Sequence, residues 1–232
     1  MIKLLRKSPF LLVFLAMCTN AENLDQKIEK FILNNPEVIL ESLKNYEEQK
    51  EKEQKVDNQI KVKKYVKQLN DTTNGLYMGN LDSKKTIIKF FDYNCSYCKK
   101  AYFDLEKILD KEKDIRVIYK NFPILSENSI FLAKLGVLAA EKSNKSFEEF
   151  YSMINKKKGL VNENELSKIL QKIGIDPDKL NNSKINKRVE SKLKKDTDLA
   201  KKLGLRGTPA FVIGDQIIFG YVGGDELLDI LN

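Results

Sequence analysis

The chain has 232 residues, with 41 lysines and arginines against 33 acidic residues, three cysteines and no histidine. This length accommodates one catalytic domain with additional segments. The absence of histidine excludes the usual general base and the commonest zinc ligand. Because the net charge of +8 is spread along the chain, we interpret it as a lysine-rich solvated surface and expect no nucleic-acid partner.

The N-terminus has the pattern of a secretory signal peptide. Three basic residues precede a short apolar run over residues 9–17, and small residues stand at the −3 and −1 positions of a cleavage site. This predicts a cleavable signal peptide over residues 1–21 and export to the periplasm. The apolar run is shorter than the about 20 residues of a membrane span, which disfavours an uncleaved anchor. A lipid anchor on Cys18 is disfavoured by the bulky Met17 before it.

Residues 22–75 are predicted to form a helical N-terminal extension. Apolar residues recur at helical spacing between residues 24 and 46, where Asn35 and Pro36 suggest a capped helix start. Residues 47–55 have no apolar side chain and carry opposite charges four positions apart, as in an exposed helix.

A helical segment of that length cannot bury a core by itself. The charged stretch separates its apolar stripe from the rest of the chain. We therefore expect residues 22–75 to join copies of the chain into a homo-oligomer. Docking of the stripe on the catalytic domain of the same chain is the alternative.

The remainder, residues 76–232, has the pattern of an α/β domain. β-branched and aromatic runs predict a strand, an amphipathic helix and a second strand, which form a parallel βαβ unit. Several helices follow over about residues 125–203, and a hairpin and a short final helix complete the chain. This split β content predicts a thioredoxin-like fold with a helical insertion.

The two cysteines beyond the signal peptide, Cys95 and Cys98, enclose Ser96 and Tyr97 where a strand runs into a helix. A helix N-terminus favours negative charge and so lowers the pKa of a thiol, and the thiolate is the nucleophile of disulfide exchange. Cys98 lies three residues on, over the same face, and can attack a mixed disulfide formed by Cys95. The spacing predicts a redox-active pair that needs no cofactor.

Two other interpretations of the cysteine pair are weaker. A zinc site would need two more ligands, and the mature chain has no further cysteine and no histidine. A purely structural disulfide that closes so small a ring would add little stability. We therefore expect no metal at this site.

A second motif, GLRGTPAFVIG, places Pro209 between a helix end and a strand. Proline there cannot donate a hydrogen bond to a sheet, and its peptide bond can be cis. By itself the motif is compatible with an ordinary trans loop. Together with the upstream cysteine pair it favours a cis bond between Thr208 and Pro209.

The segments FFDYNCSYCKK and RGTPAFVIG resemble the DsbA family of thiol:disulfide oxidoreductases, and the resemblance covers roughly residues 76–232. It implies that Cys95 is the nucleophile and that Cys98 is the resolving thiol. It also implies that the loop of Thr208 and Pro209 contacts the client backbone. In this fold family the dipeptide Ser96-Tyr97 faces the substrate.

The N-terminal extension resembles that of ScsC-like members, some of which oligomerise through it. The expected clients are unfolded or misfolded exported proteins, with a membrane protein as redox partner. An oligomer with several active sites would suit disulfide isomerisation, and a monomer recharged by a membrane partner would suit oxidation. The alternative function is a non-catalytic oligomeric scaffold that binds clients or metal.

The chain departs from the family pattern in two places. Strong oxidants of the family carry Pro-His between the cysteines, so Ser96-Tyr97 predicts a weaker oxidant. Several relatives carry a buried acid six residues before the first cysteine, where this chain has Lys89, with Asp92 three residues before it. Which group relays protons to Cys98 is therefore left open by the sequence.

Overall fold

The computed structural model describes residues 23–232. The predicted signal peptide over residues 1–21 and the alternative lipid anchor at Cys18 lie outside the described residues. The chain divides after Glu53 into two units, which are treated separately below.

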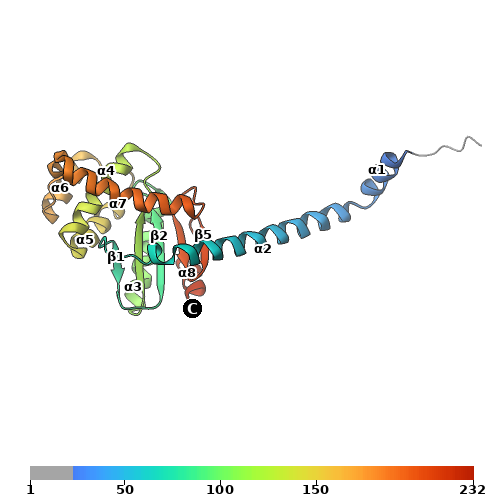
Figure 1. Ribbon diagram of the computed structural model, residues 1–232, viewed down its shortest axis with the longest axis horizontal. Helices are drawn as coiled ribbons and strands as arrows, with labels where there is room; N and C mark the ends of the chain where they lie inside the picture. Colours follow the sequence, from blue (N-terminus) through green and yellow to red (C-terminus); the bar gives the residue numbers. More distant parts are fainter. Residues whose placement is uncertain (1–22) are drawn as a thin grey trace, which may run out of the picture. The chain divides into compact units, whose positions relative to one another are not determined.

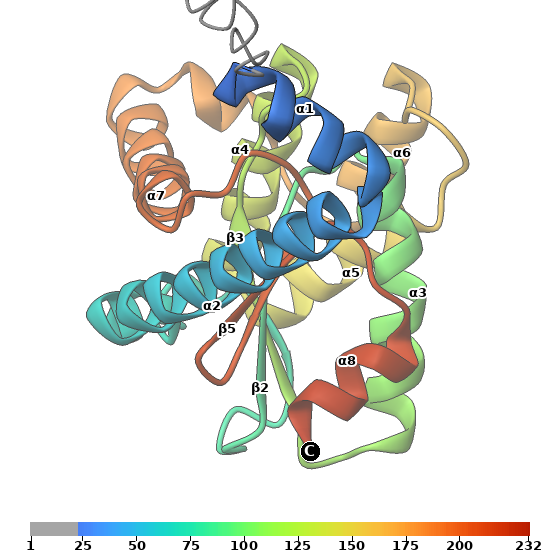
Figure 2. The same cartoon turned by 90° about the vertical axis from the view of Figure 1, so that its right-hand side faces the viewer.

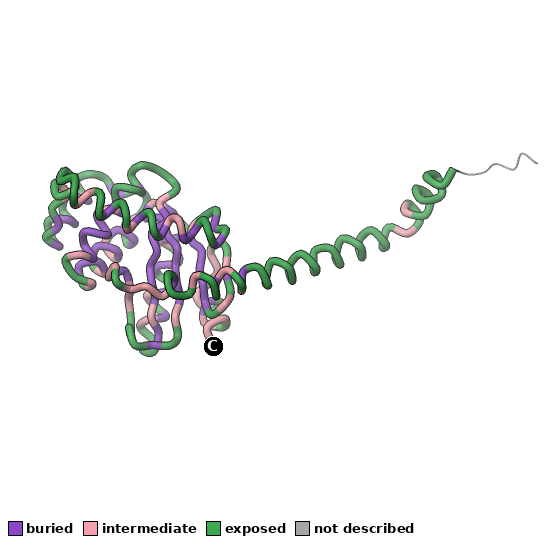
Figure 3. The backbone as a smooth tube through the Cα atoms, viewed as in Figure 1, coloured by how far each residue is buried: buried purple, intermediate pink, exposed green. Residues whose placement is uncertain are grey.

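The first unit is helical and exposed. It contains α1 (Leu24–Asn34) and the first part of α2 (Pro36–Leu69), and its backbone is coloured as exposed over almost its whole length in Figure 3. Nine of its large apolar side chains are at least 40% exposed, and Ile32 is half-buried. The nine are Leu24, Ile28, Phe31, Leu33, Val38, Ile39, Leu40, Leu43 and Tyr46.

The helical character predicted for this unit is present, with one correction to its caps. The amide of Asn35 donates to the carbonyl oxygen of Phe31 at 2.7 Å. The Asn35 side chain therefore closes α1, and it does not cap α2 as the sequence suggested. Pro36 occupies the first position of α2, as predicted.

The second unit is built on one five-stranded sheet, with strand order β1–β3–β2–β4–β5. In chain order, the strands are Tyr77–Gly79, Thr86–Phe91, Arg116–Asn121, Ala210–Ile213 and Gln216–Phe219 (Figure 1). β2 and β3 are parallel and joined by α3 (Ser96–Lys111), whereas the other neighbouring pairs are antiparallel. The predicted βαβ unit and hairpin are thus both present. The sequence does not reveal β1, because three residues are too few to show an alternating pattern.

Both faces of the sheet are covered by helices. Since side chains alternate along a strand, β2 sends Ile87 and Phe91 into one core and Ile88 and Phe90 into another. The first core lies under α3 and the helical insertion, and the second is closed by α7 and the end of α2. Figure 2 shows the sheet between α7 on one side and α3 and α8 on the other.

The last turns of α2 belong to the second unit. Val62 and Leu69 are buried in the same cluster as Ile88 and Phe90 of β2. The second unit therefore begins at Gln54, because these two apolar side chains find a core on the sheet. The role of residues 22–75 as an oligomerisation extension stays a prediction.

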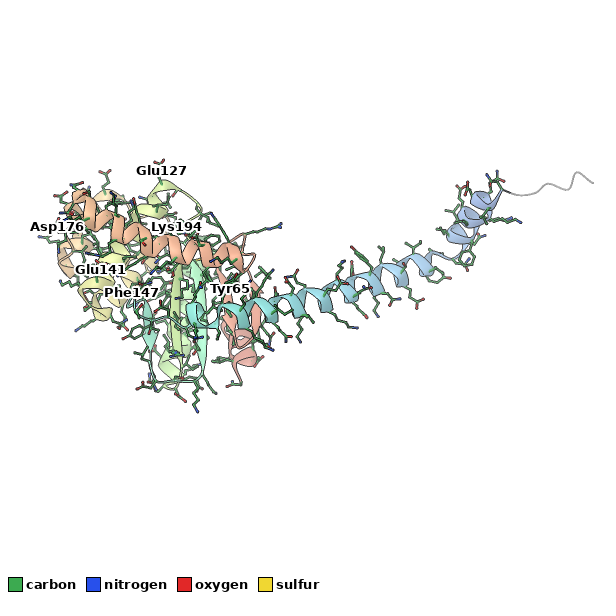
Figure 4. All side chains as sticks on the ribbon, viewed as in Figure 1. Tyr65, Glu127, Glu141, Phe147, Asp176 and Lys194 are labelled. Carbon is green, nitrogen blue, oxygen red and sulfur yellow. The ribbon has the colours of Figure 1, made fainter. Side chains whose placement is uncertain are left out.

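The helical insertion follows β3. Its elements are α4 (Glu127–Lys142), α5 (Asn144–Asn155), α6 (Glu163–Ile173), a 3-10 turn (Pro177–Asn181) and α7 (Ser183–Lys202), and α8 (Gly224–Leu231) ends the chain. Phe147 of α5, which is labelled in Figure 4, packs against Tyr119 of β3 with ring centroids 5.7 Å apart, and this contact ties the insertion to the sheet. Between residues 23 and 232, no helix combines the length and the apolar character needed to cross a membrane.

Candidate active site

Cys95 is the N-cap residue of α3. Its backbone is extended, and its Sγ accepts a hydrogen bond from the backbone N–H of Cys98 at 3.3 Å. A capping sulfur in this position satisfies one of the unpaired N–H groups at the helix start. The cap places Cys95 at the positive end of the helix dipole, where a thiolate is favoured.

The turn that carries Cys95 is anchored by two polar side chains. The buried carboxylate of Asp92 accepts hydrogen bonds from the backbone N–H of Asn94 at 2.8 Å, Ile124 at 2.9 Å and Leu125 at 3.0 Å. The amide of Asn94 donates to side-chain oxygens at the start of α4, those of Ser126, Asn128 and Ser129. Asp92 thus fixes the loop, and its three backbone partners favour a structural role over proton relay.

The two thiols have opposite electrostatic environments. The pKa of Cys95 is lowered to about 6, first by hydrogen bonding from the Cys98 side chain and also by the backbone N–H groups of Cys98 and Tyr97. These contributions outweigh partial burial. Burial raises the pKa of Cys98 well above its usual value, and the neighbouring Cys95 raises it further. Cys95 is 8% exposed and Cys98 is completely buried. Only Cys95 is therefore a thiolate near neutral pH, and only Cys95 keeps a small exposed surface.

The loop around Pro209 lies directly against Cys95. The peptide bond between Thr208 and Pro209 is cis. The thiol of Cys95 donates to the carbonyl oxygen of Thr208 at 3.1 Å, across 113 positions of sequence. The carbonyl oxygen of Pro209 accepts from the N–H of Gly220 at 3.0 Å, so the loop is also tied to the residue that follows β5.

Ser96 and Tyr97 are exposed beside the thiol, as the resemblance implied. The ring of Tyr97, 60% exposed, stacks on Tyr221 with centroids 6.1 Å apart. The hydroxyl of Tyr221 donates to Asp104 at 2.6 Å, and the Lys100 ammonium lies 4.6 Å from the centre of its ring. Sequence reasoning missed Tyr221 and Lys100, because Tyr221 comes from the segment after β5 and carries no motif of its own.

A charged side chain lies beneath the cysteine pair. Lys89 is completely buried, and its Nζ donates to the carbonyl oxygen of Cys98 at 2.9 Å. Burial lowers the pKa of Lys89 to about 8, although both cysteines and Asp104 oppose this shift. The sequence identified the position but gave no indication that the ammonium reaches the redox pair.

The described residues 23–232 contain no cluster of three or more histidine, cysteine or acidic side chains that could hold a metal ion. The alternative of a metal-binding scaffold therefore gains no support from the cysteine pair or its surroundings.

The comparison with protein families agrees with this geometry. Residues 86–232, more than half of the chain, match the family described as DSBA-like thioredoxin domain. The chain belongs to this family. The resemblance stated from the two sequence motifs, and the thioredoxin-like fold with its helical N-terminal segment, are thereby confirmed.

Known proteins similar to this DSBA-like chain include a thiol-disulfide exchange protein, α-DsbA2 from Wolbachia pipientis. It is 25% identical, with a TM-score of 0.69, and the match covers 76% of this chain and 95% of that chain. ScsC from Proteus mirabilis, in a transitional conformation, is 26% identical with a TM-score of 0.66, covering 88% of this chain and 91% of that one. Disulfide bond formation protein D from Bacillus subtilis is 25% identical over 173 residues, which are 67% of this chain and 74% of that protein.

Proposed function

We propose that this member of the thiol-disulfide oxidoreductase family catalyses disulfide exchange in exported proteins, with Cys95 as the attacking thiol and Cys98 as the resolving thiol. The observation that carries the proposal is the asymmetry of the pair. Cys95 has a pKa near 6, lies at a helix start and is 8% exposed, whereas Cys98 is completely buried and its pKa is raised. A nucleophile needs thiolate character and access, and a resolving thiol needs proximity and protection from other reagents.

The reaction follows from this asymmetry. The Cys95 thiolate attacks one sulfur of a client disulfide, and the second client sulfur leaves as a thiolate. Cys98, after losing its proton, attacks Cys95 and displaces the first client sulfur, so that the pair is oxidised and the client is reduced. In reverse, a client dithiol reduces the Cys95–Cys98 disulfide and becomes oxidised itself. A membrane redox partner would restore the pair to its working state.

The loop of Thr208 and Pro209 is proposed as the client-binding element. An extended client segment that pairs with the backbone of Thr208 would lie beside Cys95, in the manner of strand addition. Pro209 offers no N–H next to the thiols, which leaves the sulfur region free of a competing donor. Ser96 and the exposed ring of Tyr97 border the same opening and would contact the client side chains.

Isomerisation is the activity that the first unit favours. The apolar side chains between Leu24 and Tyr46 are exposed on a single chain, and such a patch on an exported protein is typical of an interface. Copies joined there would present several cysteine pairs to one misfolded client. Export to the periplasm by the signal peptide over residues 1–21 is part of the same proposal.

Thiol trapping tests the proposed roles. Cys98→Ser should accumulate mixed disulfides with scrambled ribonuclease, because the attacking thiol stays while the resolving thiol is lost. Cys95→Ser, the matched control, should accumulate none, since its remaining thiol is buried. Non-reducing gel electrophoresis with mass spectrometry identifies the adducts. Equal trapping by both variants would refute the assignment, and no reaction in the wild type would leave only the scaffold alternative.

A further inference from the structure

Lys89 is an energetically unfavourable side chain for its place in the fold. It stands in the middle of β2 and is completely buried, and removing an ammonium from water carries a large desolvation penalty. Within residues 23–232 Lys89 takes part in no ion pair, and the one hydrogen bond that its Nζ makes in this part of the chain goes to the carbonyl oxygen of Cys98. An aliphatic residue would fill this strand position at lower cost.

The surroundings direct the ammonium at the redox pair. Lys89 shares its side of β2 with Ile87 and Phe91, opposite Tyr119 on β3 and Phe211 on β4 in the strand register. The Nζ lies 5.7 Å from the ring centre of Tyr151 in α5. The sheet and the Tyr151 ring surround the rest of the side chain, so the first turn of α3 supplies the polar contact of the ammonium.

We propose that Lys89 is a positioning residue of the redox pair: its buried ammonium holds the first turn of α3 through the Cys98 carbonyl and stabilises negative charge on the two sulfurs. The inference rests on the proposed function of Cys95 and Cys98. It implies that Lys89 makes the protein more oxidising, because a cation that stabilises the thiolate stabilises the reduced form. Lys89 thereby supplies charge that the Ser96-Tyr97 dipeptide does not provide.

The effect enters at a defined step of client oxidation. A client thiolate attacks Sγ of Cys95 in the Cys95–Cys98 disulfide, the bond between the two cysteines breaks, and Cys98 leaves with the electron pair as a buried thiolate. The Lys89 ammonium keeps its proton and offsets this charge. A second client thiolate then displaces Cys95, so that two electrons have passed from the client to the pair. Protons from solvent complete the dithiol.

The charged and titratable groups that face Lys89 are few. Cys95, Cys98 and Asp104 come from α3 and its cap, and each favours the protonated amine. Tyr151 of α5 and Tyr119 of β3 are the others, and burial raises the pKa of both phenols, so they remain neutral. The Asp104 carboxylate already accepts from Tyr221. The thiolates are therefore the anions most dependent on this cation.

The equilibrium constant with glutathione measures the effect in the protein without its signal peptide. Lys89→Met keeps the length of the chain and removes the charge, and we expect at least a tenfold shift of the constant toward the disulfide, which corresponds to about 30 mV. The absorbance of the thiolate at pH 5–9 should show a higher pKa for Cys95. A purely structural role would change neither the constant nor this titration.

Lys120→Met is the matched control. Lys120 is also buried, on the neighbouring strand β3. It pairs in the strand register with Phe90, whose side chain faces the second core. Its Nζ donates to the carbonyl oxygen of Asp71. Its removal should leave the glutathione constant within twofold of the wild type. Equal shifts in both variants, or no shift in Lys89→Met, would overturn the inference.

A titration of the wild type covers the case in which Lys89→Met does not fold. Carbon-13 NMR of the lysine ε carbons, recorded on the dithiol and disulfide forms, should show a higher pKa for Lys89 in the dithiol, because linkage makes the coupling reciprocal. Equal Lys89 titrations in the two forms would refute the inference. Failure of the wild type to form a Cys95–Cys98 disulfide would instead refute the proposed function, so the two failures are distinguishable.

Discussion

The carboxylate of Asp92 should contribute strongly to stability through the active-site turn, and Asp92→Asn tests this. One oxygen accepts from the N–H of Asn94, and the other accepts from Ile124 and Leu125. An asparagine keeps one acceptor oxygen, which still accepts from the N–H groups of Ile124 and Leu125. Its amide NH₂ then faces the N–H of Asn94, and two donors form no hydrogen bond. A hydrogen bond to a charged group contributes about 1.5–3 kcal/mol. Loss of one such bond and weakening of two should lower the free energy of unfolding by about 3 kcal/mol.

Urea unfolding followed by far-ultraviolet circular dichroism measures this loss. Asp110→Asn is the matched control, because Asp110 lies exposed on α3 and its side chain makes no hydrogen bond within the described residues. We expect this control within about 0.5 kcal/mol of the wild type, as for ordinary surface substitutions. The alkylation rate of Cys95 gives a second readout, since a looser turn changes the position of the helix cap. If Asp92→Asn is as stable as Asp110→Asn, the three hydrogen bonds do not anchor the turn.

Two further predictions follow from the thiol environment and the first unit. Alkylation of wild-type Cys95 by iodoacetamide should have a pH midpoint near 6. The pKa of Cys95 is lower in the folded than in the unfolded protein, so ionisation of this thiol stabilises the fold. The dithiol form should therefore gain stability from pH 6 to 9 and lose it as the pH falls through 6. A midpoint near 9 would contradict the lowered pKa. Phe31→Asp with Leu43→Asp should convert an oligomer to a monomer in multi-angle light scattering. Leu160→Asp, a control at an exposed leucine of the second unit, should not. A wild-type monomer would refute self-association.

Local sequence patterns were sufficient to predict the redox motif and the elements that carry it. The strand before Cys95, the helix that begins at Ser96 and the hairpin after Pro209 each depend on propensities within about ten residues. The cysteine pair, its spacing and its place at a helix start therefore follow from the printed chain. The same holds for the exposed helix over residues 47–55, whose charge pattern needs no tertiary partner.

The tertiary structure alone decided which distant groups reach the sulfurs. Thr208 comes to within 3.1 Å of Cys95 across 113 positions because β4 pairs with β2, and no local pattern encodes that approach. The roles of Asp92 and Lys89 depend on backbone groups of other segments, the loop after β3 and the first turn of α3. The last turns of α2 pack on the second unit for the same reason, since Val62 and Leu69 are buried by the sheet that they cover. Sequence periodicity shows which side chains seek a core, and only the folded chain shows which core they find.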